Sequence, residues 1–366
     1  MPVKESSSTD SVVTGVKPTI NDIARHSGVS LATVDRVLNA RPGVREVTIK
    51  RVNEAIDKLG YIRDTAAANL ARRRFYQFAF LLPDATSEFI DELETQIAAQ
   101  AKLLTNERTL LQTQRLPAFD SQAIALALDE LDAESTNGVA VIGPETPAVR
   151  DAIARASERG IAVVALLSDL PSSPRDHFIG IDNTAAGHTA AQLMGRFIHQ
   201  EHGTILVLTG SRLARDHLER RLGFDSVMTK HFPHLRVLPS VEIRDKQSLE
   251  TAFAETDDIR GIYSTTANNN GLLSFLQKHD LQRHNQSHSA ASSNLVVIAH
   301  EVTPLSRKAL LSGQFDALIS QNIGHIVRSA VRLMRATVDA VPHNELQERI
   351  RIEIFLKENL PPETQS

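Results

Sequence analysis

Residues 17–74 read KPTINDIARHSGVSLATVDRVLNARPGVREVTIKRVNEAIDKLGYIRDTAAANLARRR. Thr19 precedes a short apolar-periodic run, and Asp22 follows three residues later, which is the spacing of a helix-capping box. Gly28 can adopt the positive φ with which many helices end, and Ser30 can cap the helix that follows. The pattern therefore predicts two short helices joined by a tight turn, which is a helix-turn-helix.

A third helix is predicted around Val52, Ala55, Ile56 and Leu59, with Gly60 just beyond its end. The outward side of the second helix is small, polar and basic, as a helix that lies in the major groove requires. It shows Leu31, Ala32, Thr33, Asp35 and Arg36. The periodicity alone also allows a three-helix cap or a dimerisation module.

The identities of the residues in this segment are more specific evidence than the spacing of its apolar residues. TINDIARHSGVSLATVDRVLN, followed by the pattern VR..T..RV..AI..LGY, closely resembles the lactose-repressor (LacI/GalR) family. The resemblance implies a DNA-binding head whose DNA-contacting positions are Thr19, Ser30, Leu31, Ala32, Thr33, Asp35, Arg36, Asn39 and Tyr61. Leu31 and Ala32 can contact thymine methyl groups but cannot hydrogen-bond a base through their side chains, so the operator sequence does not follow.

Residues 64–72, DTAAANLAR, occupy the hinge-helix position of the same family. The segment is rich in alanine but too short to be a stable helix in isolation. The resemblance implies that paired hinge helices form on operator DNA, where Leu70 wedges into the minor groove beside Ala67.

Composition adds a charge asymmetry. The chain has 366 residues, no cysteine and a net charge of −4, but residues 1–76 hold 13 Lys and Arg against 8 Asp and Glu. The remainder holds 27 against 36, so a head of net charge +5 precedes a body of −9. A basic head suits a polyanionic partner. We expect a cytoplasmic protein with no membrane segment, no cofactor and no metal.

From about residue 77, short apolar strands alternate with amphipathic helices, which predicts parallel sheets with right-handed crossovers. Residues 237–242 are predicted to form one strand, and the polar stretch 282–294 is predicted to form a loop. The number of βα units favours two doubly wound lobes. The fold class is therefore an all-α head followed by an α/β two-lobed body.

The body resembles the ribose-binding type of periplasmic sugar-binding protein, in which the chain crosses between lobes three times; we place crossings near residues 182, 320 and 343. The expected organisation is a leader (1–16), a head (17–62), a hinge and linker (63–76), a body (77–358) and a tail (359–366). Lobe 1 takes residues 77–182 and 322–342, and lobe 2 takes 183–320 and 343–358.

Ligands of such sheets bind at the carboxyl ends of strands, so two facing lobes form a cleft. Arg220, in the string LERRLGF, matches a family arginine whose guanidinium can donate to two adjacent hydroxyls. Polar residues that follow predicted strands complete the effector-binding set, together with one aromatic that can stack on a sugar: Asp84, Phe89, Glu145, Asp182, Asn268, Asn270, His300, Glu301 and Gln321. Phe89 can equally be a core residue, and the asparagines can simply form a turn.

The alternatives have weaker support. The chain contains no GxSxG, P-loop, HExxH or strand-linked GxGxxG motif, which argues against an enzyme. A transport protein would share the body but not the head. We therefore predict a transcriptional repressor of carbohydrate-utilisation genes, a homodimer on a pseudo-palindromic operator that a sugar-like effector releases. A corepressor-dependent regulator and an architectural DNA-binding protein without effector stay open.

Overall fold

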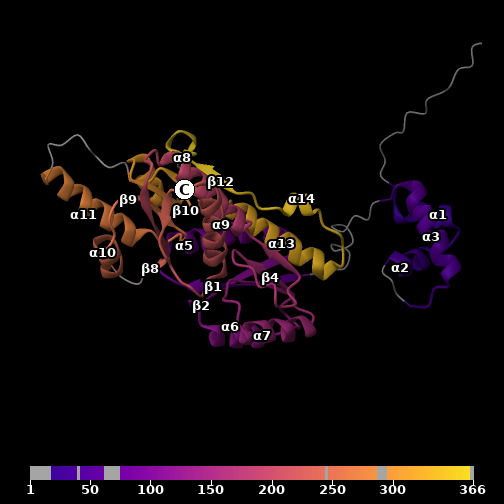
Figure 1. The fold of residues 1–366 in the computed structure, drawn as a ribbon. Helices are drawn as coiled ribbons and strands as arrows, with labels where there is room; N and C mark the ends of the chain where they lie inside the picture. Colours follow the sequence, from indigo (N-terminus) through magenta and orange to yellow (C-terminus); the bar gives the residue numbers. More distant parts are fainter. Residues whose placement is uncertain (1–17, 39–41, 62–74, 244–245, 287–294, 363–366) are drawn as a thin grey trace, which may run out of the picture. The chain divides into compact units, whose positions relative to one another are not determined.

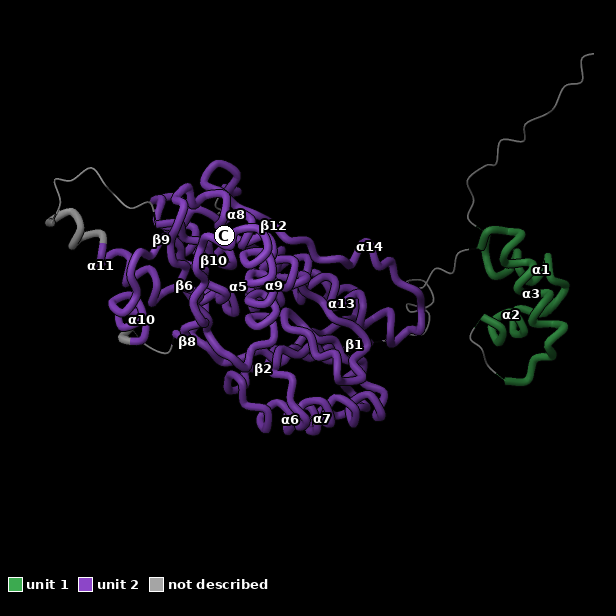
Figure 2. The backbone as a smooth tube through the Cα atoms, viewed as in Figure 1, with its two compact units in different colours: residues 1–74 green, residues 75–366 purple. Residues whose placement is uncertain are grey.

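The computed structural model describes residues 18–38, 42–61, 75–243, 246–286 and 295–362. The chain forms two compact units, residues 1–74 and residues 75–366, which we call the head and the body (Figure 2). Within the described ranges, no helix is both long enough and apolar enough to cross a bilayer.

The head consists of α1 (Ile20–Ser27), α2 (Leu31–Leu38) and α3 (Glu46–Leu59). At the start of α1, the backbone N and Oγ1 of Thr19 donate to Asp22 Oδ2 at 2.9 and 2.7 Å. Gly28 and Gly60 end α1 and α3 with φ of 66° and 61°, a left-handed conformation that costs glycine little. The predicted caps and helix ends are therefore confirmed.

One small cluster of apolar side chains holds the three helices together. Its buried members are Ile23, Ala24, Val34, Val52 and Ala55. The i, i+3, i+4 spacing of apolar residues places these side chains on the inner faces of the helices. Because the cluster is so small, each of its larger side chains supplies a substantial share of the apolar area that stabilises the head.

The first sheet of the body has the order β2-β1-β3-β4-β5, and all its strands are parallel. They are β1 (Tyr76–Asp84), β2 (Thr109–Pro117), β3 (Gly138–Val141), β4 (Ala162–Leu166) and β5 (His177–Ile179). Alternate residues of β1 point to opposite faces. Phe78 and Phe80 pack with α5 (Glu88–Leu104) and α13 (Ile323–Asp339), whereas Leu81 packs with α6 (Ser121–Asp129) and α7 (Pro147–Glu158). We call this sheet with its four helices the first lobe (Figure 1).

The second sheet has the order β12-β11-β10-β9-β6-β7, and β8 pairs with β6. Its strands are β6 (Gly203–Thr209), β7 (Leu235–Val237), β8 (Val241–Glu242), β9 (Ile259–Ser264), β10 (Val296–His300), β11 (Ala317–Ser320) and β12 (Glu353–Phe355). Only β12 is antiparallel to its neighbour. One face packs with α8 (Asn183–Phe197) and α9 (Arg215–His231), and the other with α10 (Lys246–Ala254), α11 (Asn270–Gln286) and α12 (Pro304–Leu311). These elements form the second lobe.

The chain passes between the two lobes three times. The passages are residues 180–182 between β5 and α8, residues 321–322 between β11 and α13, and residues 340–352 between α13 and β12, which include α14 (Glu345–Glu348). At the base of the first lobe, the hydroxyl of Tyr76 donates to both carboxylate oxygens of Asp339, at 2.8 and 2.7 Å. This contact joins the first residue of β1 to the last residue of α13.

Two sequence-based expectations were wrong in detail. Residues 237–242 do not form one strand, because β7 ends at Val237 and β8 begins at Val241. Pro239 lies between them, and proline has no N–H to donate to a ladder. The predicted polar loop 282–294 begins too early, since α11 continues to Gln286. After Gly271, in its first turn, α11 contains no glycine or proline that would stop the helix before Gln286.

Candidate functional site

The head presents the outer side of α2 as its candidate DNA-binding surface. Leu31 is 49% exposed, and Ala32 and Arg36 are also exposed, so all three are available for contact. Ser30 accepts a hydrogen bond from the backbone N–H of Thr33 at 3.2 Å and therefore caps α2. Thr33 and Asp35 are half-buried.

The remaining predicted DNA-binding residues divide into two groups. Thr19 is engaged in the cap of α1, and Tyr61 is half-buried and packs against the head core. Asn39, Ala67 and Leu70 lie outside the described residues.

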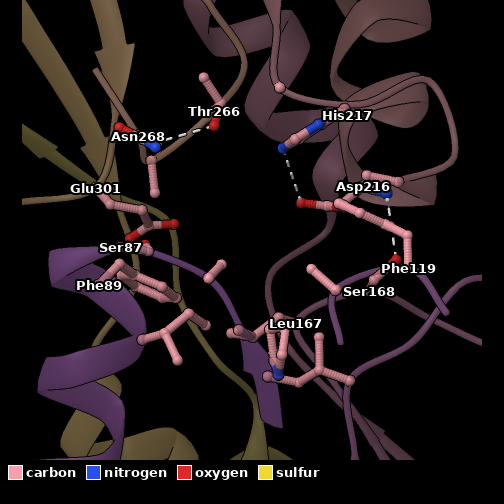
Figure 3. A pocket seen from close by; sticks show the side chains of 18 of the residues that line it. Ser87, Phe89, Phe119, Leu167, Ser168, Asp216, His217, Thr266, Asn268 and Glu301 are labelled. Atoms are coloured by element: carbon pink, nitrogen blue, oxygen red, sulfur yellow. Dashed lines mark hydrogen bonds and ion pairs between the residues drawn. The ribbon is translucent and has the colours of Figure 1, made fainter. Parts of the chain in front are cut away.

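The body contains a pocket of about 330 Å³ between the two lobes (Figure 3). Its lining comes largely from residues that directly follow strands. Ile142, Leu167 and Ser168 follow strands of the first lobe, and Glu301 and Gln321 follow strands of the second. Parallel strands bring these carboxyl ends together, which is where open α/β sheets bind ligands.

Arg220 on α9 forms the centre of the polar side of the pocket. Its side chain is nearly fully buried, with Nε donating to Asn183 Oδ1 at 2.9 Å and Nη1 to the Thr265 carbonyl at 2.8 Å. Its Nη2 lies 3.8 Å from Asp216 Oδ2 and 3.8 Å from Glu301 Oε1. Two nitrogens of the guanidinium therefore hold it in place, and the third lies between two carboxylates.

Glu301 follows β10 with a φ of 65°, which is uncommon for a residue other than glycine. Its carboxylate accepts from Gln321 Nε2 at 2.9 Å and from Ser320 Oγ at 3.1 Å. Burial raises the pKa of this carboxyl above 4.5, although Arg220 and these hydrogen bonds act in the opposite direction. Strained backbone of this kind occurs at ligand sites, where the surrounding structure enforces it.

Asp216 and His217 lie one helical turn before Arg220 and also line the pocket. The backbone N–H of Asp216 donates to Ser168 Oγ of the first lobe at 3.4 Å. His217 Nδ1 lies 3.3 Å from the backbone N of Ser211, and burial lowers the pKa of this imidazole. His217 is therefore neutral at pH 7 and adds no positive charge to the pocket.

Five predicted effector-binding residues line the pocket: Phe89, Arg220, Asn268, Glu301 and Gln321. Asn268 also joins the lobes, because its Nδ2 donates to the carbonyl of Thr86 at 3.3 Å. The structure thus brings these side chains together, while their contact with an effector stays a prediction.

The structure places the other five outside the lining: Asp84, Glu145, Asp182, Asn270 and His300. Asp182 caps α8 by accepting from the backbone N–H of Ala185 at 2.9 Å, and Glu145 pairs with Arg215. Asp84 and Asn270 are exposed at the end of β1 and the start of α11.

His300 is the clearest difference from the expected positions. It is fully buried, and its Nε2 lies 2.9 Å from the hydroxyl of Tyr263. Burial lowers the pKa of this imidazole well below 6.5. His300 therefore lies in the interior of the second lobe, and only Glu301, the next residue along the chain, reaches the pocket.

Sequence reasoning missed several lining residues, among them Asp216, His217, Ser168 and Phe119. A signal for two of them was present, because Asp216 and His217 stand four and three residues before Arg220 and so share its helix face. Phe119 had no such signal, since it lies between β2 and α6 and its φ of 62° is set by the folded loop.

Comparison with known protein families gives one match for the head and another for the body. Residues 19–64 match the family of bacterial regulatory proteins, lacI family, and residues 78–340 match the periplasmic binding protein domain. HTH-type transcriptional regulator DegA of Bacillus subtilis is 24% identical over 253 residues, which cover 69% of this chain and 72% of that protein. Catabolite control protein A of Priestia megaterium is 41% identical over 75 residues, only 20% of this chain and 23% of that protein.

Among solved structures, GanP, a glucose-galactose binding protein from Geobacillus stearothermophilus, superposes with a TM-score of 0.66 at 18% identity. The match covers 79% of this chain and all of that one, and at this identity it supports the fold alone. The head and the body each match one family. Over residues 78–340, more than half of its length, this chain therefore belongs to the periplasmic binding protein domain family, and its head, residues 19–64, matches the lacI family of bacterial regulatory proteins.

Proposed function

We propose that this protein is a transcriptional repressor of carbohydrate-utilisation genes that leaves its operator when a sugar-like effector occupies the pocket. The observation that carries the proposal is the position of the pocket, since it is lined by both lobes and centred on Arg220. A ligand there touches both lobes at once and can favour one lobe arrangement over another. A ligand shifts such an equilibrium only by the difference between its affinities for the two states.

The exposed side of α2 supports sequence-specific DNA binding, and the proposal places this activity in the cytoplasm. Leu31, Ala32 and Arg36 are exposed on α2, the position of the recognition helix in a helix-turn-helix. A homodimer follows from the proposal, because a pseudo-palindromic operator offers two half-sites to two identical heads. The hinge role of residues 63–76, with Ala67 and Leu70 in the minor groove, belongs to the proposal as well.

The contacts between the lobes support a closed arrangement in this structure. Besides Asn268 with Thr86, the backbone N–H of Leu305 donates to Glu88 Oε2 at 3.1 Å. In the proposed mechanism, effector in the pocket adds to these contacts, the hinge segments change their spacing across the dimer, and the operator is released. A corepressor scheme uses the same contacts with the opposite sign of response.

The test combines operator selection with ligand titration. Binding sites are selected from random DNA with purified protein, and fluorescence anisotropy of the selected site is followed at two salt concentrations with and without a panel of sugars, polyols and cyclitols. We expect a pseudo-palindromic site and release by at least one compound. Tighter binding with that compound would instead establish corepression.

Arg36→Ala should weaken operator binding without changing effector affinity, and Lys102→Ala, on α5 of the body, is the matched loss of a positive charge. If selection yields no preferred sequence and binding depends on salt alone, the protein is an architectural DNA-binding protein and the proposal fails.

A further inference from the structure

Two histidines lie against each other near the end of α13, where the chain leaves the first lobe. His177 is the first residue of the edge strand β5, and His343 belongs to the passage of residues 340–352. Their ring centroids are 4.8 Å apart and the ring planes meet at 85°, which is an edge-on contact. His177 Nε2 also lies 3.1 Å from Thr337 Oγ1, in the last turn of α13. The pair therefore fastens the beginning of the passage to the first sheet.

The later part of the passage is held by contacts that persist in mild acid. His325 Nε2 lies 2.9 Å from the carbonyl oxygen of Gln347. A carbonyl can only accept, so His325 donates here, and an additional proton on Nδ1 leaves this bond intact. Arg332 donates to both carboxylate oxygens of Glu348, at 2.8 and 2.6 Å. Burial raises the pKa of this carboxyl, but its hydrogen bonds outweigh burial and lower it. We therefore expect α14 to stay attached to α13 when histidines are protonated.

The histidine pair responds to acid in the opposite way. Two protonated imidazoles in this contact repel each other, because both carry a positive charge. The charged neighbours of His177 are His343 in the passage and Arg175 and Asp176 in the loop before β5, while α13 faces the ring with the neutral hydroxyl of Thr337. Burial and His343 lower the pKa of the His177 imidazole, Asp176 opposes them, and Arg175 adds to the decrease.

The contact weakens as the pH falls. Because the pKa of His177 is lowered while the ring lies against His343, the released ring binds a proton more readily than the ring in contact. The contact is therefore complete above about pH 6.5 and is lost progressively below it. Asp176 compensates only in part, since its Oδ2 already accepts from the backbone N–H of Val163 at 2.7 Å.

We propose that His177 and His343 form a pH-sensitive clasp, closed at neutral pH, that releases residues 341–344 from β5 when both rings are protonated. The released segment follows Asp339, whose carboxylate binds the hydroxyl of Tyr76 at the start of β1. Opening of the clasp therefore loosens the chain beside the beginning of the body, and α14 confines the change to these few residues. This inference does not use the proposed function, because it concerns the body alone.

Hydrogen exchange of the full-length protein at pH 7.5 and 5.5 tests the clasp. Protection factors, which divide out the intrinsic pH dependence of exchange, are compared for single backbone amides. The amides of Ala340 and Val341 donate to the carbonyls of Thr337 and Ala336 at 3.1 and 3.0 Å, so they report whether this end of the passage is held. We expect their protection to fall at least fivefold at pH 5.5. The amides of α14 should change by less than twofold.

Two variants separate the charge from the ring. His343→Phe keeps an aromatic ring against His177 but cannot be protonated, so protection of the reporting amides should be the same at both pH values. His343→Lys loses the ring contact and keeps a positive charge, so these amides should be weakly protected already at pH 7.5. The matched control is His188→Gln, at an exposed position of α8, which should show the same decrease as the parent protein.

The inference is overturned if the protection of Ala340 and Val341 in the parent protein is independent of pH, or if the His343→Phe variant shows the same decrease as the parent. The amides of α7 distinguish local opening from a general loss of stability, because this helix belongs to the same lobe. An equal decrease in α7 would show that acid acts on the whole lobe, and would overturn the clasp as well.

Discussion

Arg215, the first residue of α9, forms an ion pair with Glu145, which follows β3, and the pair joins the two lobes beside the pocket. Both partners have further contacts that orient them. Glu145 Oε1 accepts from the backbone N–H of Ser172 at 2.9 Å, and Arg215 Nε donates to Glu219 at 2.7 Å. Neither partner lines the pocket, but the neighbouring residues Ala214 and Asp216 do. The pair therefore stabilises the observed arrangement of the two lobes from a position outside the pocket lining.

Removal of this ion pair should weaken effector binding. A partly exposed pair contributes about 0.5–1 kcal/mol, so Glu145→Gln and Arg215→Gln should each raise the effector Kd by about two- to fivefold. The double variant should resemble the single ones rather than multiply them, because the same contact is lost. Titration at low and high salt gives the second readout, since salt screens this pair. If the increase in effector Kd of the double variant equals the product of the two single increases, the two residues do not act through their mutual contact.

The crossing of α8 and α9 should tolerate no additional atom. A Cβ at Gly187 would lie 2.0 Å from the carbonyl oxygen of Arg220, so Gly187→Ala must push the two helices apart. Overpacking of this kind costs about 1–3 kcal/mol of unfolding free energy. Effector affinity should fall as well, because the shift moves Arg220.

Gly271→Ala on α11 is the matched control for this prediction. The added Cβ would meet only Ile243 Cγ2, at 3.6 Å, which is ordinary contact. Chemical denaturation and ligand titration of both variants provide the measurement. Equal effects of the two substitutions would contradict the role of the close helix crossing.

His300 should make the body less stable in mild acid. Burial lowers the pKa of its imidazole well below 6.5, so below that pH the unfolded chain binds a proton that the folded chain does not. The unfolding free energy therefore falls as pH decreases below about 6.5, by at most about 1.4 kcal/mol per pH unit for one group. The raised pKa of Glu301 acts in the opposite direction, because its folded form binds the proton more readily as pH decreases toward 4.5.

The His300 contribution can be isolated by substitution. His300→Gln keeps a polar partner for Tyr263 but cannot titrate, so its loss of stability between pH 7 and 5.5 should be smaller than that of the parent protein. Thermal unfolding across this range is the measurement, and His188→Gln at an exposed position of α8 is the control. Parallel pH profiles of the His300 variant and the parent would exclude this origin.

Substitution of Ile23 in the core of the head should unfold the head and leave the body folded. Ile23 is fully buried in a cluster with few other members, and Ile→Ala at such a site costs about 2–5 kcal/mol. Ile23→Ala should therefore abolish operator binding and leave effector affinity intact, since the body is a separate compact unit. Ile20→Ala, at a partly exposed position of the same helix, should have a small effect. A loss of effector binding in the Ile23 variant would contradict the independence of the two units.

The features that could be predicted from sequence depend on local spacing. Thr19 with Asp22, Gly28 and Gly60 specify the helix ends of the head within a few residues of chain, and the structure has all of them. The alternation of strands and helices could also be predicted, because each buried strand is a short apolar run that can be recognised from its own residues. Arg220 could be singled out because its string carried the family resemblance.

The remaining features depend on contacts between distant residues. Glu145 follows a strand as a pocket residue does, but its partner Arg215 is 70 positions away and draws it out of the lining. His300 and Glu301 are adjacent and seemed equivalent, but one ends β10 facing the lobe interior and the other adopts a positive φ that turns it to the pocket. The residues next to Glu145 do not show that it pairs with Arg215. The residues next to Glu301 do not show that its backbone is left-handed.

The hydrogen bonds from Tyr76 to Asp339 have a mechanical consequence. Tyr76, the second residue of the body, is hydrogen-bonded to the last residue of α13, after which the chain passes to the second lobe through residues 340–352. In the proposed mechanism the second lobe moves relative to the first, and these hydrogen bonds connect the start of residues 340–352 to the start of β1. The base of the first lobe would then act as a fulcrum, so that displacement of the effector lobe is delivered at the attachment point of the DNA-binding unit.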